Sequence, residues 1–311
     1  MSTPKLGLAL GSGGARGLAH CGVLEALHAA NLPVHVVAGT SMGALVGALY
    51  ARNPDPEVVW DALSRYREDN EVAAQWAAFV PHREEDENTL TRPWHTLFDF
   101  MQRGRIAVRT MTASSVEGAD KLRGPLGRLF NGCDTFEDLA VPMASVALDL
   151  MDGDMVTFSE GDLLDGLYAS CAIPGVFPPL ERDERVIVDG GGPFRVPVEA
   201  CRDLGADFVV AVDIPGYQET NLRNGFDLGM RSNTIARDRL NEFVCQTADV
   251  LVRPDVRHVH WADFGAADEV RRIGREATEA VLPELVHRWR RRNSPIRRLV
   301  SRMGQAMGGA A

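Results

Sequence analysis

A serine between two glycines offers the clearest chemistry in this sequence. Ser41 lies in the run Gly39-Thr40-Ser41-Met42-Gly43, which matches the pattern G-x-S-x-G. A β-branched run precedes it, and an Ala/Leu/Val segment that favours a helix follows it. At a sharp turn from strand to helix, a serine is held in strained backbone with its hydroxyl exposed, and the helix N-terminus supplies free N–H groups. The short pattern also arises by chance in ordinary turns, so its position between a strand and a helix is what favours a nucleophile.

A glycine-rich loop near the N-terminus is the second candidate element. Gly11-Ser12-Gly13-Gly14-Ala15-Arg16-Gly17 follows a predicted strand and opens a predicted helix. A dinucleotide cradle fits poorly, because Arg16 stands where G-x-G-x-x-G needs its last glycine, and no Gly-Lys-Ser/Thr is present for a P-loop. Consecutive glycines also present unobstructed N–H groups to an oxyanion, and the later serine turn favours this second interpretation. Arg16 would then orient the loop or counter the oxyanion, with a structural ion pair as the alternative.

A nucleophilic serine needs a base, and Asp189 is better placed for this role than any histidine. It follows the apolar run Val186-Ile187-Val188 and precedes three glycines, so we expect it at the carboxyl end of a strand, where ligands bind in open α/β sheets. A partly desolvated carboxylate there has a raised pKa and can accept the serine proton directly. An Asx-turn that caps the strand end is an equally good interpretation. His20 is expected to be packed or capping, and no later histidine follows a strand with a glycine turn (His82, His95, His258, His260, His287).

The composition of the chain limits which classes of protein it can belong to. The chain has 311 residues and a net charge of −10, which argues against a nucleic-acid binder. Its five cysteines show no metal-type spacing and fit a reducing compartment, with Cys21, Cys171 and Cys201 expected as buried thiols. We see no signal peptide and no apolar run long enough to span a bilayer. These features predict a cytoplasmic protein, at most peripheral to the inner face of the membrane.

Hydrophobic periodicity predicts strands and helices that alternate along the chain. This order predicts a mostly parallel sheet with helices on both faces, in one domain over residues 1–285. Residues 80–118 are the least readable stretch and are interpreted as a variable cap-like insertion or as ordinary packed helices. We expect strands at 5–10, 34–38, 143–150, 155–159, 185–188, 207–214 and 250–252, and helices at 18–30, 41–50, 55–79, 122–130, 162–170, 196–204, 232–247 and 268–292.

A basic C-terminal tail follows this domain. Residues 286–311 carry seven arginines up to Arg302, and no acid lies between Val286 and Arg302. Trp289 and several aliphatic residues among these arginines suggest peripheral membrane contact through residues 286–303. Two alternatives to membrane contact are that the tail is a solvated helix end or that it binds the acidic body of a neighbouring chain. A homo-oligomer therefore remains an open interpretation.

Four segments together resemble the patatin-like phospholipase family, and most closely the bacterial proteins related to the neuropathy-target-esterase catalytic domain. The segments are the glycine loop 11–17, the serine turn 39–43, Asp189-Gly190-Gly191, and residues 169–179 with the sequence A-S-C-A-I-P-G-V-F-P-P. Their order is the order found in the family. The resemblance covers residues 5 to about 285 and is weakest across 80–118.

The resemblance implies a three-layer α/β/α fold and a Ser–Asp dyad in which Ser41 is the nucleophile and Asp189 the base. It implies oxyanion donors in the glycine loop, to which we add Met42, the residue after the nucleophile. The reaction implied is hydrolysis of acyl lipid esters, of the phospholipase A or lysophospholipase type, with no metal or other cofactor and no calcium. The loop donors are expected among Gly13, Gly14, Ala15 and Arg16, and the glycines that shape the site are Gly11, Gly17, Gly39, Gly43, Gly190 and Gly191.

Two other functions stay open at this point. A thioesterase or acyl-protein esterase would use the same dyad on another leaving group, and a non-catalytic member would use the acyl pocket or the surface for regulation. One departure from the family concerns substrate choice rather than the dyad. The family often has a small or polar residue, commonly Asn, in the third place after Asp-Gly-Gly, whereas here Gly192-Pro193-Phe194-Arg195 follows. Phe194 is expected to narrow the pocket or to shift this loop.

Overall fold

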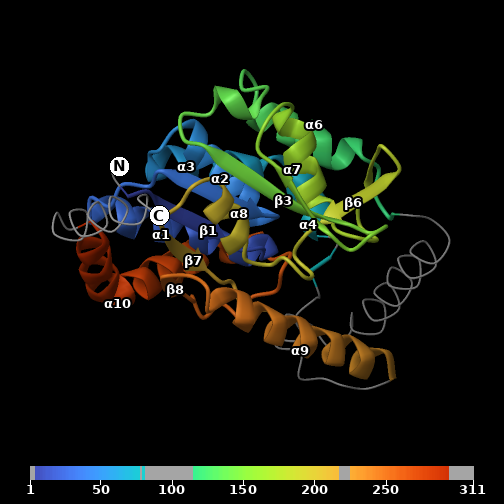
Figure 1. Cartoon of the computed structure of the whole chain (residues 1–311). Coiled ribbons are helices and arrows are strands. Elements are labelled where there is room, and N and C mark those ends of the chain that lie inside the picture. The colour runs from blue at the N-terminus through green and yellow to red at the C-terminus, as the bar shows by residue number, and fades with distance from the viewer. Residues whose placement is uncertain (1–3, 78, 81–114, 217–224, 294–311) are drawn as a thin grey trace, which may run out of the picture.

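The fold is described from a computed structural model of residues 4–77, 79–80, 115–216 and 225–293 (Figure 1). Its centre is an eight-stranded mixed sheet with the strand order β5-β6-β3-β2-β1-β7-β8, and β4 pairs with β3 off this path. The strands are β1 Leu6–Leu10, β2 Val36–Thr40, β3 Met143–Asp149, β4 Met155–Phe158, β5 Leu180–Arg182, β6 Arg185–Asp189, β7 Phe208–Val212 and β8 Val250–Val252.

The parallel part of the sheet sets where the loops gather. β1, β2, β3, β7 and β8 pair in parallel, so their carboxyl ends lie along the same edge. We call this edge the carboxyl edge of the sheet. β6 pairs with β3 in antiparallel orientation, and β4 and β5 extend this half as further antiparallel strands.

Helices cover both faces of the sheet and form three layers (Figure 1). Leu6, Leu8 and Leu10 of β1 point into the larger apolar core, whereas Ala9 belongs to the core on the other face. This alternation follows from the two-residue period of a strand. The helices are α1 Ala19–Ala29, α2 Met42–Arg52, α3 Pro56–Glu68, α4 Asn70–Ala77, α6 Asp120–Leu129, α7 Leu163–Cys171, α8 Val198–Asp203, α9 Gly225–Cys245 and α10 Ala267–Arg292.

The expected architecture is confirmed, and the differences are local. The helix expected over 55–79 is two helices, because α3 ends at Glu68 and Asp69 caps the start of α4 through its side chain. α9 begins at Gly225 rather than at 232, and β5 was not expected. Most of the expected insertion at 80–118, and the tail beyond residue 293, lie outside the described residues.

The boundary expected at residue 286 stays a prediction, but one residue assigned to the tail belongs to the core. α10 continues to Arg292, and Trp289 is buried against the rings of Phe208 and His35. The expected membrane contact of Trp289 is therefore wrong, because this side of the last helix turn packs against the domain. Across the described ranges, no helix combines the length and apolar character needed to cross a bilayer.

Candidate active site

The turn between β2 and α2 holds Ser41 in strained backbone. The residue has φ 56° and ψ −123°, in a region that a residue with a Cβ rarely adopts. Such a conformation costs about 1–3 kcal/mol and persists only where the surrounding structure enforces it. Ser41 precedes the first residue of α2 and is buried, with 7% of its surface exposed. Its placement is that of a nucleophile elbow.

The glycines on either side allow this turn to be so tight. A Cβ on Gly43 would lie 2.2 Å from the carbonyl oxygen of Leu10, and one on Gly39 would lie 2.3 Å from the carbonyl oxygen of Gly43. Both contacts are with backbone atoms, which cannot rotate away. These two glycines therefore permit the close packing of the strand, the helix and the glycine loop.

A second serine, Ser170, fixes the backbone of Ser41. Its Oγ accepts a hydrogen bond from the Ser41 N–H at 2.8 Å and donates to the carbonyl oxygen of Val146 at 2.6 Å. Ser170 lies on α7 and is fully buried. Sequence reasoning gave this residue no role, although it stands within the segment 169–179 that carries the family resemblance. The signal available was a serine among the buried residues in the second half of α7.

Asp189 ends β6 and faces the serine. Its carboxylate accepts a hydrogen bond from the N–H of Gly191 at 2.7 Å and lies near enough to the Ser41 hydroxyl for that group to influence its pKa. Burial raises the pKa of Asp189 to about 6, and the Ser41 hydroxyl and the Gly191 N–H, which favour the charged form, offset only part of this effect. The Gly191 contact also shows the Asx-type turn that was the alternative interpretation. Asp189 therefore caps the end of its strand and also lies beside Ser41.

Strand β3 brings these two residues together. Val146 pairs with Thr40, which precedes the serine, and the next residue of β3, Ala147, pairs with Asp189. Because β2 is parallel and β6 antiparallel to β3, the two strands end at neighbouring positions of the same strand. Residues 148 positions apart in the sequence (189 − 41) thus meet at one point.

The glycine loop lies beside them and offers N–H groups. Within the described residues, the N–H groups of Gly13, Gly14 and Met42 have no hydrogen-bond acceptor, as an oxyanion hole requires. The N–H of Ala15 instead donates to the carbonyl oxygen of Trp261 at 2.7 Å. That bond removes Ala15 from the set of available donors.

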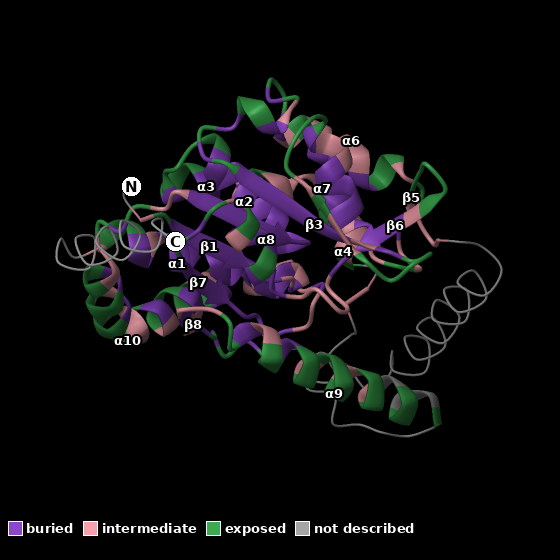
Figure 2. Ribbon diagram, in the orientation of Figure 1, coloured by how far each residue is buried: buried purple, intermediate pink, exposed green. Residues whose placement is uncertain are grey.

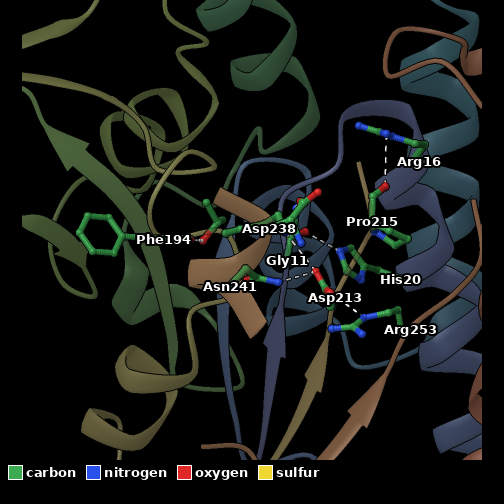
Figure 3. A network of polar contacts seen from close by, with 11 residues as sticks. Gly11, Arg16, His20, Phe194, Asp213, Pro215, Asp238, Asn241 and Arg253 are labelled. Carbon is green, nitrogen blue, oxygen red and sulfur yellow. Dashed lines mark hydrogen bonds and ion pairs between the residues drawn. The ribbon is translucent and has the colours of Figure 1, made fainter. Parts of the chain in front are cut away.

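Arg16 and His20 hold the loop in shape (Figure 3). Arg16 donates from Nε to the carbonyl oxygen of Gly13 and from Nη1 to that of Pro215, both at 3.2 Å. Burial, and then the charge of Arg195, lower the pKa of Arg16 to about 10, so it stays a cation at neutral pH. His20 is fully buried, with Nε2 2.7 Å from the carbonyl oxygen of Gly11, and burial lowers its pKa to about 4. These contacts match the interpretation in which Arg16 orients the glycine loop. His20 is packed in the core, as expected.

The cavity above Ser41 is lined almost entirely by apolar side chains. Several come from elements that sequence reasoning did not connect with the site. Trp76, Trp261 and Phe264 form an aromatic cluster on one side, with ring centroids 5.6–5.9 Å from that of Trp76. The remaining lining residues are Gly14, Met42, Leu45, Tyr66, Leu122, Leu126, Cys171 and Ile173. Such a lining suits a hydrocarbon chain better than a polar group.

Phe194 does not line this cavity, contrary to expectation. Its ring packs against the core on the other face of the sheet, and Figure 3 shows it pointing away from Arg16 and His20. The backbone of Phe194 contributes instead, because its carbonyl oxygen accepts a hydrogen bond from Thr40 Oγ1 at 2.9 Å. The segment 192–195 therefore supports the serine turn through its backbone, and the Phe194 ring does not line the cavity.

Comparisons with known proteins identify relatives of this chain. The chain is 33% identical to a patatin-like phospholipase domain-containing protein of Caenorhabditis elegans over 242 residues, covering 76% of this chain and 15% of the relative. It is 34% identical to an uncharacterized NTE family protein of Mycobacterium tuberculosis over 217 residues, covering 70% of this chain and 51% of the relative. The chain thus spans about half or less of these relatives.

Among solved structures, VipD from Legionella pneumophila aligns with a TM-score of 0.48 at 15% identity, over 91% of this chain and 67% of that chain. A likeness of this degree adds nothing to the fold derived from the strand order. The family model described as patatin-like phospholipase matches residues 8–202, a span that contains the glycine loop, the serine turn and Asp189. The chain belongs to the patatin-like phospholipase family.

Proposed function

We propose that this protein is a serine hydrolase of acyl lipid esters that uses a Ser41–Asp189 dyad. The observation that carries the proposal is that neighbouring positions of β3 bring Ser41 beside Asp189, a buried carboxylate whose pKa is raised to about 6. A base with a pKa just below neutrality is largely ionised at pH 7 and still accepts a proton well. Family membership and the apolar cavity support an acyl lipid, either a phospholipid or a lysophospholipid, as the substrate.

The proposed reaction has two halves. In the first, Asp189 takes the Ser41 proton while Oγ attacks the ester carbonyl carbon, and the N–H groups of Gly13, Gly14 and Met42 stabilise the oxyanion. The protonated Asp189 then gives its proton to the leaving alcohol, and an acyl-serine ester forms. In the second half, Asp189 deprotonates a water molecule that attacks this ester. Asp189 then gives this proton to Ser41 Oγ as the acyl–serine bond breaks, which releases the fatty acid and restores Ser41.

Arg16 acts in this scheme as a positioning residue. Its bond to the Gly13 carbonyl fixes the peptide plane that presents the Gly14 N–H. Gly14 itself has φ 56°, and a Cβ there would lie 2.4 Å from the Trp261 carbonyl oxygen. The loop is therefore held from two sides, by Arg16 and by Trp261, which also lines the cavity.

Covalent labelling tests the proposal against a non-catalytic role. A fluorophosphonate probe should label wild type and the surface control Ser232→Ala, and should not label Ser41→Ala. Asp189→Asn should react far more slowly, since no base activates the serine. Equal labelling of wild type and Ser41→Ala would disprove the dyad. Comparing oxygen esters with thioesters of one acyl chain then separates a lipase from a thioesterase.

A further inference from the structure

The carboxyl edge of the sheet carries an unusual concentration of exposed apolar side chains. Seven large apolar residues are exposed in the described part of the chain, and six of them lie in only two elements. Leu150 and Met151 form the tip of the turn between β3 and β4. The other four are on α9: Leu228, Ile235, Leu240 and Phe243. The seventh, Val58, lies on α3.

α9 extends beyond the sheet at this edge. Asn241 donates from Nδ2 to Asp213 Oδ1 at 2.9 Å, and Asp213 follows directly after β7 (Figure 3). Asn241 is also the first buried residue along the described side chains of α9. The 16 helical steps from Gly225 to Asn241 span about 24 Å of helix. Most of α9 therefore projects past the strand ends, and Figures 1 and 2 show it reaching out from the body with a largely exposed surface.

The projecting helix is firmly anchored at its base. Arg195 forms ion pairs with Asp238 of α9 at 2.6 Å and with the buried Asp213 at 3.1 Å. Its carbonyl oxygen accepts a hydrogen bond from the N–H of Ser12 in the glycine loop at 2.9 Å. Arg253 donates to the second oxygen of Asp213 at 2.8 Å. The position of α9 relative to the proposed oxyanion loop is thus fixed by charged contacts.

The apolar residues of α9 lie on the side of the helix away from this anchor. At 100° per residue, Leu228, Ile235, Leu240 and Phe243 fall within one arc of about 140°, and Asn241 falls opposite its centre. No described residue covers them. Large apolar side chains exposed together on one face mark a surface that binds a partner.

The second apolar element lies at the same edge, across the active site. In the register of β3, Val146 pairs with Thr40, so Leu150 stands four residues, or about 13 Å, beyond the level of the serine turn. In the strand order, β3 and β7 lie on either side of β2 and β1. The proposed catalytic loops, which follow β1 and β2, are therefore flanked by apolar residues on both sides.

We propose that α9 and the β3–β4 turn together dock this edge on the surface of a lipid bilayer. The inference rests on the proposed function, since a dyad acting on bilayer lipids must approach the membrane with its carboxyl edge. The sequence of α9 holds three arginines and three acids, so this helix is neutral in a chain of net charge −10. Apolar insertion, rather than attraction to anionic lipid, would drive the contact. Docking therefore needs no negative lipid and depends weakly on salt.

Sedimentation with phosphatidylcholine vesicles tests this surface. The α9 variant combines Leu228→Gln, Ile235→Gln, Leu240→Gln and Phe243→Gln, which keep the helix propensity of the exposed positions high. The turn variant is Leu150→Gln with Met151→Gln. The matched control is Val58→Gln, because Val58 is 41% exposed on α3, near the opposite edge of the sheet. We expect the α9 variant to bind vesicles at least tenfold more weakly than wild type, the turn variant severalfold more weakly, and the control like wild type.

Hydrolysis of a short-chain, water-soluble ester separates this inference from the proposed function. Both apolar variants should hydrolyse it like wild type while losing activity on vesicles. Vesicle binding without any esterase activity would overturn the proposed function and leave the docking surface standing. Wild-type affinity in the α9 variant would overturn the docking surface. The docking surface would also be overturned if the α9 variant bound vesicles like wild type but showed a changed molar mass by light scattering or a lower melting temperature. In that case another copy or another segment of this chain would cover α9.

Discussion

The hydroxyl of Ser170 accepts a hydrogen bond from the backbone N–H of Ser41 at 2.8 Å. This contact stabilises a residue whose φ of 56° is otherwise unfavourable. It also links α7 to the serine turn through β3, since the same hydroxyl donates to Val146. The strained turn is thus held by a side chain 129 positions later in the sequence.

Ser170→Ala should lower both stability and kcat. The buried Ser41 N–H would lose its acceptor, which costs about 1–3 kcal/mol of unfolding free energy. A looser turn should also reduce kcat by about tenfold. Ser145→Ala is the matched control, because Ser145 also links β3 to α7, through the Gly166 carbonyl at 2.9 Å, but does not reach Ser41. Equal kcat losses in the two variants, measured beside urea unfolding, would contradict a positioning role for Ser170.

Ser41→Ala and Asp189→Asn should each abolish hydrolysis of p-nitrophenyl acyl esters without unfolding the protein. The first variant removes the attacking oxygen, and the second keeps the shape of the side chain but cannot accept a proton. Circular dichroism checks the fold, and Ser232→Ala, on the exposed surface of α9, serves as the active control. Full activity in either dyad variant would exclude that residue from the chemistry.

Activity should rise with pH through about pH 6 and then level off. Asp189 must be ionised to accept the Ser41 proton, and burial raises its pKa to about 6, so the protonated and inactive form dominates below that value. A profile of kcat/KM between pH 4.5 and 8 on a soluble ester measures this pKa in the free enzyme. A limb centred near pH 4 would mean that the carboxylate is not desolvated in the free enzyme.

The same pKa shift predicts that Asp189 destabilises the folded protein at neutral pH. Its folded pKa of about 6 lies above the ordinary aspartate value of 3.8, so the folded state holds its proton over a pH range where the unfolded state has lost it. The free energy of unfolding should fall as pH rises from about 4 to 6, by up to about 3 kcal/mol. Asp189→Asn should lack this contribution and unfold at higher urea concentration than wild type at pH 8. A variant less stable than wild type at pH 8 would show that lost hydrogen bonds outweigh the desolvation of the charge.

Gly43→Ala should eliminate activity through packing alone. The added methyl group would meet the Leu10 carbonyl oxygen at 2.2 Å and push the serine turn away from the glycine loop. We expect a loss of about 1–3 kcal/mol in unfolding free energy together with loss of esterase activity. Gly192→Ala provides the control, since a Cβ at that position would have no heavy atom of another segment within 4 Å. An active Gly43→Ala protein would show that the close approach is not needed.

Local chemistry in the sequence determined the strand–turn–helix at Ser41, the glycine loop and the placement of Asp189 at a strand end. Each depends on residues within about ten positions, where β-branched runs, glycines and helix formers decide the backbone. The absence of a well-placed histidine also narrowed the base to a carboxylate. Sequence periodicity predicted the mostly parallel sheet for a related reason, because alternating strands and helices have few ways to pack.

Contacts between distant segments were decided only by the tertiary structure. The antiparallel entry of β6 beside β3 brings Asp189 to Ser41, and Trp261 takes up the N–H of Ala15 that sequence reasoning counted as an oxyanion donor. The ring of Phe194 turned away from the cavity, and α9 proved to be a projecting helix rather than the short helix expected from 232. Pairing register and burial depend on which surfaces meet after the chain has folded, and neighbouring residues alone do not determine this.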